Sequence, residues 1–172
     1  ENIDITILTE LTYFSAFNSL RLSEINVSNN IKLNYLDLTG AIFLERLDVS
    51  ELTELEYLLL WGNSSLGTVD VSENTKLKYF DHGVSLITTM DVSHNPELEY
   101  LNLGKSKVSS IDVSNNPNLK YLDLFNTSVS EVELSNNALI EVLDLSATYL
   151  ITSIDTSNNP DLKVLNLSSS SI

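Results

Sequence analysis

The chain has 172 residues, 24 acidic and nine basic, which gives a formal net charge of −15 at pH 7. This excess of negative charge argues against nucleic acid and anionic membrane surfaces as partners, because both need a positive footprint. No stretch is apolar over the length of a membrane span. Since the chain has no cysteine, disulfides, zinc–thiolate sites and thiol nucleophiles are excluded, whereas a basic partner stays compatible with the composition.

One pattern recurs from end to end with a period of 21 or 22 residues. An apolar residue opens each unit, at Ile3, Ile25, Leu47, Val69, Met90, Ile111, Val132 and Ile154. A second apolar column follows each of these 11 residues later, at Phe14, Leu36, Leu58, Phe80, Leu101, Leu122, Leu143 and Leu165. The return to the next unit takes 11 residues or 10, as expected where a loop absorbs one residue. We therefore expect one domain of about eight stacked units over residues 1–172, the first of them irregular.

Apolar and polar residues alternate in both halves of each unit. The first half contains runs such as Ile25-Asn26-Val27-Ser28, and the second half runs such as Leu36-Asp37-Leu38. A period of two predicts short strands, so we expect two strands per unit, joined by turns rich in Ser, Asn and Pro. Helical periodicity is absent, although the least regular segment, Leu8 to Ser23, leaves room for one helical turn.

The run Val108, Ile111, Val113 and Asn116 matches the signature LxxLxLxxN, and the same columns recur along the chain. In this the chain resembles leucine-rich-repeat proteins, specifically the irregular 21/22-residue bacterial class. The resemblance implies an all-β, right-handed parallel β-solenoid with little or no helix. We expect it to be weakly curved, because the two halves of each unit are nearly equal in length.

The resemblance also implies an asparagine ladder whose side chains hydrogen-bond the backbone in one turn. Its members are Asn30, Asn74, Asn95, Asn116, Asn137 and Asn159. Leu8 and Leu52 occupy that column in two units, so the turn there departs from the family pattern. His82 falls where other units have an inward leucine, and we interpret it as a local defect in the core rather than a catalytic group.

The first candidate binding site is an aromatic column in the second half of the units. Alternation along a strand places its tyrosines outward, together with the residues two and four positions on. The candidate ligand-binding residues are Tyr35, Tyr57, Leu59, Trp61, Tyr79, Tyr100, Tyr121 and Phe125, and Tyr13 and Phe17 share the columns. Aromatic residues are favoured in binding patches. The alternative is that the tyrosines only brace the sheet by packing across strands.

The second candidate is an acidic column in the first half of the units, with a serine two residues after most members. The candidate residues are Asp48, Asp70, Asp91, Asp112 and Asp155, and Asp4 and Glu133 belong to the same column. Such a row of oxygen ligands could hold Ca²⁺ or dock a basic partner. However, no calcium loop accompanies it, so we expect no metal. The simplest interpretation is a solvated strip whose carboxylates are satisfied by neighbouring hydroxyls and turn amides.

These observations favour a secreted or cell-surface bacterial binding module for a protein or a glycan. No catalytic or cofactor motif is present, so we expect neither an enzyme nor a cofactor. The alternative function is a structural spacer within a larger surface protein. The chain also enters and leaves inside repeats, without polar caps. We therefore expect either that it is part of a longer array or that chains associate end to end.

Overall fold

The computed structural model describes residues 2–172, so Glu1 lies outside the described residues. Over that range the chain forms ten strands of three residues each and no helix. The strands are β1 (Asn2–Asp4), β2 (Tyr13–Ser15), β3 (Glu24–Asn26), β4 (Tyr35–Asp37), β5 (Tyr57–Leu59), β6 (Tyr79–Asp81), β7 (Tyr100–Asn102), β8 (Tyr121–Asp123), β9 (Val142–Asp144) and β10 (Val164–Asn166). The expected all-β architecture is confirmed.

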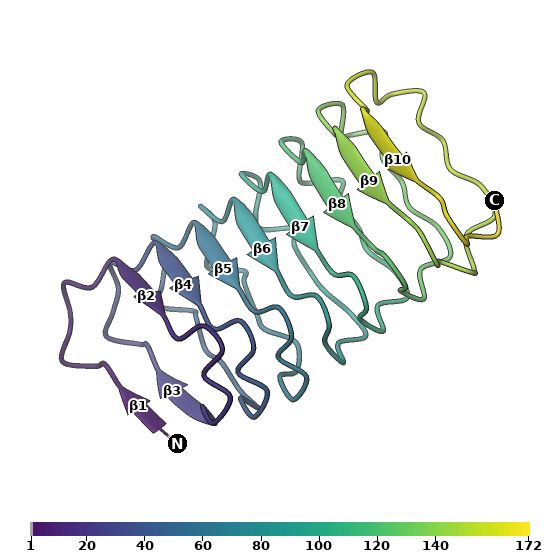
Figure 1. Cartoon of the computed structure of the whole chain (residues 1–172). Coiled ribbons are helices and arrows are strands. Elements are labelled where there is room, and N and C mark those ends of the chain that lie inside the picture. The colour runs from purple at the N-terminus through teal and green to yellow at the C-terminus, as the bar shows by residue number, and fades with distance from the viewer. Residues whose placement is uncertain (1) are drawn as a thin grey trace.

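Eight of the strands form one parallel sheet in the order β10-β9-β8-β7-β6-β5-β4-β2 (Figure 1). Each strand pairs with its equivalent in the next repeat, and the register follows the sequence columns, with Tyr35 opposite Tyr57 and Leu36 opposite Leu58. The repeat period of the sequence therefore sets the strand pairing directly. The predicted parallel solenoid of about eight turns is confirmed.

The first halves of the units differ from the expectation of a second continuous sheet. Among residues 2–172, only β1 and β3 pair there, as a separate two-stranded sheet, and later units run extended without forming strands. The side chains still alternate, because Ile111 and Val113 are buried and Asp112 is exposed. Alternation reports which side of an extended backbone faces inward, and it does not require backbone pairing between neighbours. The prediction of two strands per unit was therefore wrong beyond the second unit.

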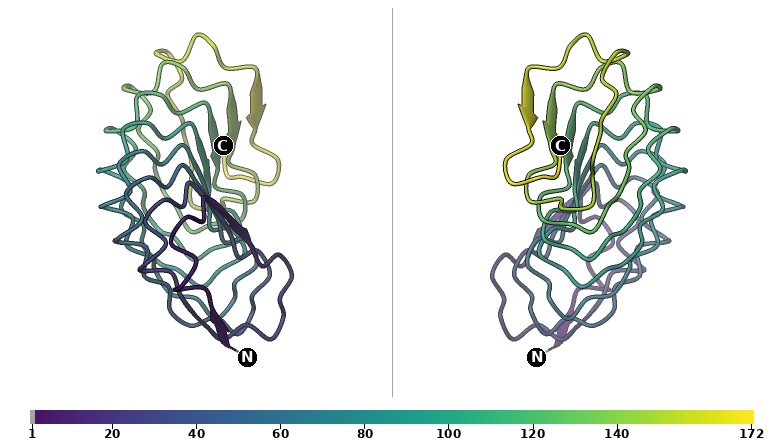
Figure 2. Two further views of the ribbon diagram at one scale, coloured as in Figure 1. Left: turned by 90° about the vertical axis from the view of Figure 1, so that its left-hand side faces the viewer. Right: turned by 90° about the vertical axis from the view of Figure 1, so that its right-hand side faces the viewer.

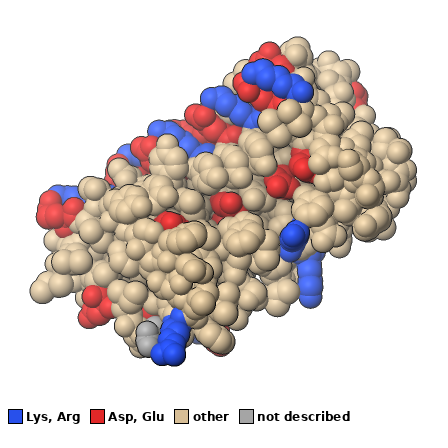
Figure 3. Space-filling view, viewed as in Figure 1, with Lys and Arg blue, Asp and Glu red and all other residues tan. Residues whose placement is uncertain are grey.

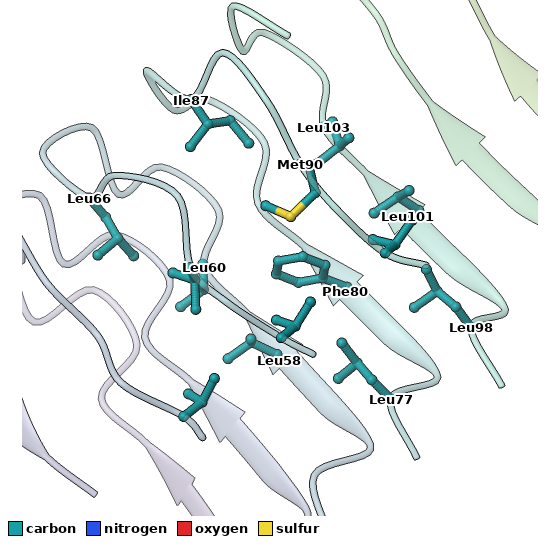
Figure 4. Close-up of a cluster of buried hydrophobic side chains, with 14 of the residues drawn as sticks. Leu58, Leu60, Leu66, Leu77, Phe80, Ile87, Met90, Leu98, Leu101 and Leu103 are labelled. Carbon is teal, nitrogen blue, oxygen red and sulfur yellow. The ribbon is translucent and has the colours of Figure 1, made fainter. Parts of the chain in front are cut away.

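The core is a single column of apolar side chains that runs through the whole stack. Each repeat contributes leucine, isoleucine or valine from both halves, and Figure 4 shows this packing in the middle repeats, where Phe80 and Met90 lie among leucines. Phe80, Leu58 and Leu101, from three successive strands, are fully buried. Neighbouring repeats bury the apolar face that no single repeat could bury alone, so stability is shared along the stack.

The asparagine ladder forms as the resemblance implied. Asn116 is fully buried and its Nδ2 donates to the carbonyl oxygens of Val92 and Asn95, both at 2.9 Å. The units without an asparagine keep the same turn, because Asn74 donates to the carbonyl oxygen of Leu52 at 2.8 Å. A ladder asparagine donates to backbone carbonyl oxygens of the preceding repeat, so the side chain of the equivalent residue in that repeat need not be an asparagine. The two departures therefore leave the turn intact.

A second regular feature is a left-handed backbone position just after each strand of the large sheet. Asn18, Gly40, Gly62, Val84, Lys105, Asn126, Ala147 and Ser169 all have φ between 52° and 77°. Glycine and asparagine tolerate this conformation, whereas a β-branched residue such as Val84 adopts it under strain. The one-residue difference in repeat length falls immediately downstream, between this position and the buried Leu, Ile or Val that follows it three or four residues on.

The repeats stack into an elongated body whose strands follow a shallow arc, with the two ends of the chain at opposite ends of the stack (Figure 1). The end-on views show that successive turns have the same outline (Figure 2). The weak curvature agrees with the expectation from the sequence. Among residues 2–172 there is no helix long and apolar enough to cross a membrane.

Candidate functional site

The outward side of the eight-stranded sheet, here called the sheet face, carries three parallel columns of side chains. The tyrosine column contains Tyr13, Tyr35, Tyr57, Tyr79, Tyr100 and Tyr121, followed by Val142 and Val164. The middle column, two residues on, contains Ser15, Asp37, Leu59, Asp81, Asn102, Asp123, Asp144 and Asn166. The outer column, two residues further, contains Phe17, Thr39, Trp61, Gly83, Gly104, Phe125, Ser146 and Ser168. All of the predicted aromatic-face residues lie in these columns.

The rings of the tyrosine column contact one another from Tyr13 to Tyr121, and all neighbouring pairs are stacked except Tyr35 and Tyr57, which are tilted by 34°. The packing is tightest in the middle of the sheet, where the Tyr79 and Tyr100 ring centroids are 3.9 Å apart and the planes differ by 5°. It is loosest around Tyr57, whose centroid lies 5.8 Å from that of Tyr35 and 6.1 Å from that of Tyr79. Since the ring faces cover one another, mainly edges and hydroxyls are left for a ligand. This geometry supports a bracing role for most of the column.

The middle column closes the turn at the end of each strand. In seven of the eight repeats its side-chain oxygen accepts a hydrogen bond from the backbone N–H two residues on, as Asp37 does from Thr39 at 3.0 Å and Asn102 from Gly104 at 2.8 Å. Leu59 is the exception, because a leucine cannot accept such a bond. The third repeat thus gives up a turn-stabilising contact and presents an apolar side chain on the sheet face instead.

Trp61, in the outer column, follows Leu59 of the middle column on the sheet face and is 47% exposed. Its indole lies over Gly83 of the next repeat, where a β-carbon would come within 3.2 Å of Trp61 Cδ1. Farther along the column, Lys105 Nζ lies 5.4 Å from the ring centroid of Phe125. The rings of Trp61 and Phe125 make no ring-to-ring stack in the described part of the chain, in contrast to the tyrosines.

Between Trp61 and Phe125 the sheet face is hollowed. A hollow of about 180 Å³ is lined by Trp61, Val84, Asn102, Gly104, Lys105, Asp123 and Phe125. Gly104 is part of its lining, and there Asp123 Oδ1 and Asn102 Oδ1 come within 2.9 and 3.2 Å of the position that a β-carbon would take. A second hollow of about 280 Å³ runs along the tyrosine column from Tyr57 to Tyr121 and is bordered by Lys78, Glu99 and Lys120. The two hollows lie on the same face, on either side of the middle column.

Burial perturbs the carboxylates of the middle column. Desolvation raises the pKa of Asp81 to about 6, although hydrogen bonds from Gly83 and Asn102 oppose the shift and the charge of Asp123 adds to it. Desolvation also raises the pKa of Asp123, to which the charge of Asp144 contributes. Perturbed carboxylates in a cleft are a feature of functional sites as well as of structural networks. At neutral pH the charged forms of these carboxyl groups are therefore disfavoured by burial and by one another.

The acidic column lies on the opposite side of the repeats and is built differently. Each of Asp48, Asp70, Asp91, Asp112 and Asp155 is exposed and accepts a hydrogen bond from the backbone N–H of the serine two residues on, at 2.8–3.0 Å. These bonds to the serine amides and hydroxyls lower the pKa of each carboxyl. The geometry is that of turn-closing groups. Residues 2–172 contain no group of three or more His, Cys, Asp or Glu placed to hold a metal ion.

A charged edge, not anticipated from the sequence, borders the tyrosine column. Glutamate and lysine alternate from repeat to repeat, with ion pairs Glu56–Lys78 at 3.0 Å, Glu99–Lys120 at 2.7 Å and Glu141–Lys163 at 2.8 Å. Figure 3 shows the alternation of acidic and basic side chains along this edge. The signal was available in the sequence as a column of alternating sign, one residue before the tyrosine column, from Glu56 to Lys163. Exposed pairs of this kind contribute little stability each, but they avoid like charges on adjacent repeats.

Beneath Trp61 the core contains two polar residues in neighbouring repeats. His82 is fully buried, as expected of a defect in the leucine column, and its Nε2 lies 3.1 Å from the carbonyl oxygen of Gly67. Asn63 is also fully buried, and neither its amide atoms nor His82 Nδ1 has a hydrogen-bond partner in the described part of the chain. The third and fourth repeats therefore combine most departures from the repeat pattern: Leu59, Trp61, Asn63, His82 and Val84.

No protein-family model matches the sequence, and no curated protein matches it. Solved structures do match its fold. The functional domain of InlJ from Listeria monocytogenes superposes with a TM-score of 0.80 at 24% identity, over 98% of this chain and 42% of that one. A leucine-rich-repeat protein from Leptospira interrogans gives 0.81 at 17% identity, over 99% and 49%. An internalin C2 from Listeria monocytogenes gives 0.74 at 18% identity, over 92% and 81%.

The chain thus has the leucine-rich-repeat fold, which confirms the resemblance seen in the sequence. It spans less than half the length of the InlJ domain and of the Leptospira protein. The InlJ domain includes a cysteine ladder, whereas this chain has no cysteine and carries an asparagine ladder. At these identities the similarity establishes the fold alone.

Proposed function

We propose that the chain is an extracellular bacterial binding module that recognises a protein or a glycan through the sheet face around Leu59 and Trp61. The observation that carries this proposal is the break in the middle column. Every other repeat has a turn-closing polar side chain where the third repeat has Leu59, and an exposed tryptophan follows it. A local loss of stabilising contacts without structural compensation is typical of a surface kept for binding.

The bacterial and extracellular parts of the proposal rest on the solved structures that share the fold. The similar structures named above come from bacteria, and two of them are internalins. The proposal is one of binding rather than catalysis, with no cofactor. The acidic column is the second choice of surface, because its carboxylates already accept hydrogen bonds from turn amides. A spacer function is favoured by the stacked tyrosines and paired charges, but it does not explain Leu59 and Trp61.

Leu59→Asn separates binding from folding. Asparagine occupies the same column at Asn102 and Asn166, where it closes the turn, so the variant should be at least as stable as the parent. We expect it to lose roughly ten-fold or more in affinity for partners captured on an array of purified proteins and glycans. Asp112→Asn on the opposite side is the matched control. Equal binding by parent and Leu59→Asn would remove the sheet face as the site.

Self-association is a separate part of the proposal. Leu165 in the last repeat is 40% exposed, whereas its equivalents Leu122 and Leu143 are fully buried by the repeat that follows. We propose that this surface is covered either by a further repeat of a longer array or by end-to-end contact between chains. Light scattering across a concentration series should show association that Leu165→Glu abolishes. A strict monomer at every concentration would rule out the end-to-end contact.

A further inference from the structure

The hollow between Trp61 and Phe125 has the size of a subsite for one small ring. Trp61, Gly83, Gly104 and Phe125 follow one another in successive repeats, so the aromatic positions are roughly 14 Å apart along the stack. Trp61 leans over Gly83, whereas the side chains of Asn102 and Asp123 lie against Gly104, so polar groups line the hollow between the two aromatic residues. The volume of about 180 Å³ is below the roughly 300–1,000 Å³ of drug-sized pockets. It suits one unit of an extended ligand that continues along the sheet face.

Asn102 leaves hydrogen-bonding capacity at the floor of this hollow. Its side chain is only 9% exposed, and Oδ1 accepts the bond from Gly104 N at 2.8 Å. Nδ2 makes one long contact, 3.4 Å to Asp81 Oδ2. An amide nitrogen has two N–H donors, so at least one is available to a ligand.

Asp123 supplies a free acceptor beside it. Its Oδ1 accepts from Phe125 N at 2.8 Å. Elsewhere in the column, the second carboxylate oxygen receives a bond from an adjacent repeat, as in Asp37 from Ser15 at 3.0 Å and Asp144 from Asn166 at 2.9 Å. No such bond reaches Asp123 Oδ2 from residues 2–172, because the next repeat places Asp144 there. The hollow thus combines an unused donor and an unused acceptor.

The charges around the hollow disfavour ionic ligands of either sign. Lys105 Nζ lies over Phe125 and lines the same hollow, so a basic side chain would meet a cation. An anion would meet Asp123, with Asp81 and Asp144 close by in the same column. A hydroxyl group both donates and accepts, so it can satisfy Asn102, Asp123 and Lys105 together.

The aromatic side chains of Trp61 and Phe125 provide the apolar surface that a sugar ring also needs. The C–H face of a pyranose ring is apolar and packs on an aromatic ring, while its hydroxyls point to the sides. We propose that this hollow binds one ring of a neutral oligosaccharide, with the C–H face against Trp61 or Phe125 and hydroxyls on Asn102, Asp123 and Lys105. The inference rests on the proposed function and assigns a ligand class to the same face.

The test uses an array on which neutral oligosaccharides, charged oligosaccharides and purified proteins are printed together. The neutral oligosaccharide bound most strongly is then titrated in solution, and the emission of Trp61, the only tryptophan of the chain, is followed. We expect a saturable change in emission. Asp123→Asn should weaken the affinity by roughly ten-fold or more, and Asp112→Asn should leave it within about two-fold.

Asp123→Asn should fold, because asparagine already closes the same turn at Asn102 and Asn166. An unchanged melting temperature within a few degrees checks this. Binding only to printed proteins, and lost in Leu59→Asn, would keep the proposed function and overturn the saccharide inference. Binding only to charged oligosaccharides, or neutral binding that Asp123→Asn leaves unchanged, would also overturn it. A chain that binds nothing on the array would contradict both.

Discussion

Trp61 lies against Gly83 of the following repeat, at a position with almost no room for a side chain. A β-carbon there would come within 3.2 Å of Trp61 Cδ1 and 3.1 Å of the Gly104 carbonyl oxygen. We expect Gly83→Ala to destabilise the fold by about 1–3 kcal/mol and to shift the emission of Trp61, because backbone or indole must move. Gly67→Ala is the matched control, since nothing lies within 4 Å of its β-carbon position. Equal melting temperatures for the two variants would contradict this packing.

Val84 is strained because it occupies the left-handed column with φ of 52°. Asparagine holds the same position at Asn18 and Asn126, so Val84→Asn should raise the free energy of unfolding by about 1 kcal/mol. Introducing a valine at another position of the same column, Gly62→Val, should lower the free energy of unfolding by about 1–2 kcal/mol. Urea denaturation of both variants measures the two changes. The interpretation fails if Val84→Asn is less stable than the parent.

A buried asparagine of the ladder should contribute more to the free energy of unfolding than an exposed asparagine beside it. Asn116→Ala leaves the carbonyl oxygens of Val92 and Asn95 without their side-chain donor. We expect a loss of about 2 kcal/mol, reduced from a larger value because Asn116 Oδ1 itself has no partner. Asn115→Ala, at an exposed position, should change stability by less than about 0.5 kcal/mol. Chemical denaturation of the two variants provides the comparison.

His82 should make the fold less stable in mild acid. Burial lowers the pKa of His82 below its usual range, although the Gly67 carbonyl opposes the shift. Below about pH 6.5 the unfolded chain therefore binds a proton that the folded chain does not, and stability falls as pH falls. His82→Leu restores the leucine column, so its advantage should be larger at about pH 5 than at about pH 8. Melting temperatures at the two pH values test this, with exposed His94→Gln as control; a constant advantage would argue against the burial of a neutral imidazole.

The sequence predicted the stack well because its columns are enforced by packing. Leu36, Leu58 and Phe80 must all point inward, so their spacing reveals the register, and Asn116 must satisfy backbone groups that its turn exposes. Backbone pairing in the first halves was overestimated, because alternation at Ile111 and Val113 is required of any extended segment with a buried side.

The details of the sheet face were harder to predict, since they depend on side-chain directions. Sequence columns placed Trp61 and Phe125 outward, but not the tilt of the indole over Gly83. Nor did they show that the tyrosine rings would cover one another's faces. The alternation of Glu56, Lys78 and Glu99 was visible in the sequence as a column and requires only a comparison across repeats. The hollow lies where Gly83 and Gly104 separate Trp61 from Phe125 in the outer column. These four residues become neighbours only when the strands pair, so the sequence alone did not reveal the hollow.

The most direct test of the binding surface is the ratio of affinities of two aromatic variants for the strongest partner found on the array. Trp61 and Phe43 are similarly exposed, but Phe43 lies in a turn outside the three columns of the sheet face. We expect Trp61→Ala to weaken binding by roughly ten-fold or more, with its melting temperature within a few degrees of the parent, because the side chain points away from the core. Phe43→Ala should bind within about two-fold of the parent. Equal affinities for the two variants, or unfolding of Trp61→Ala, would contradict the account.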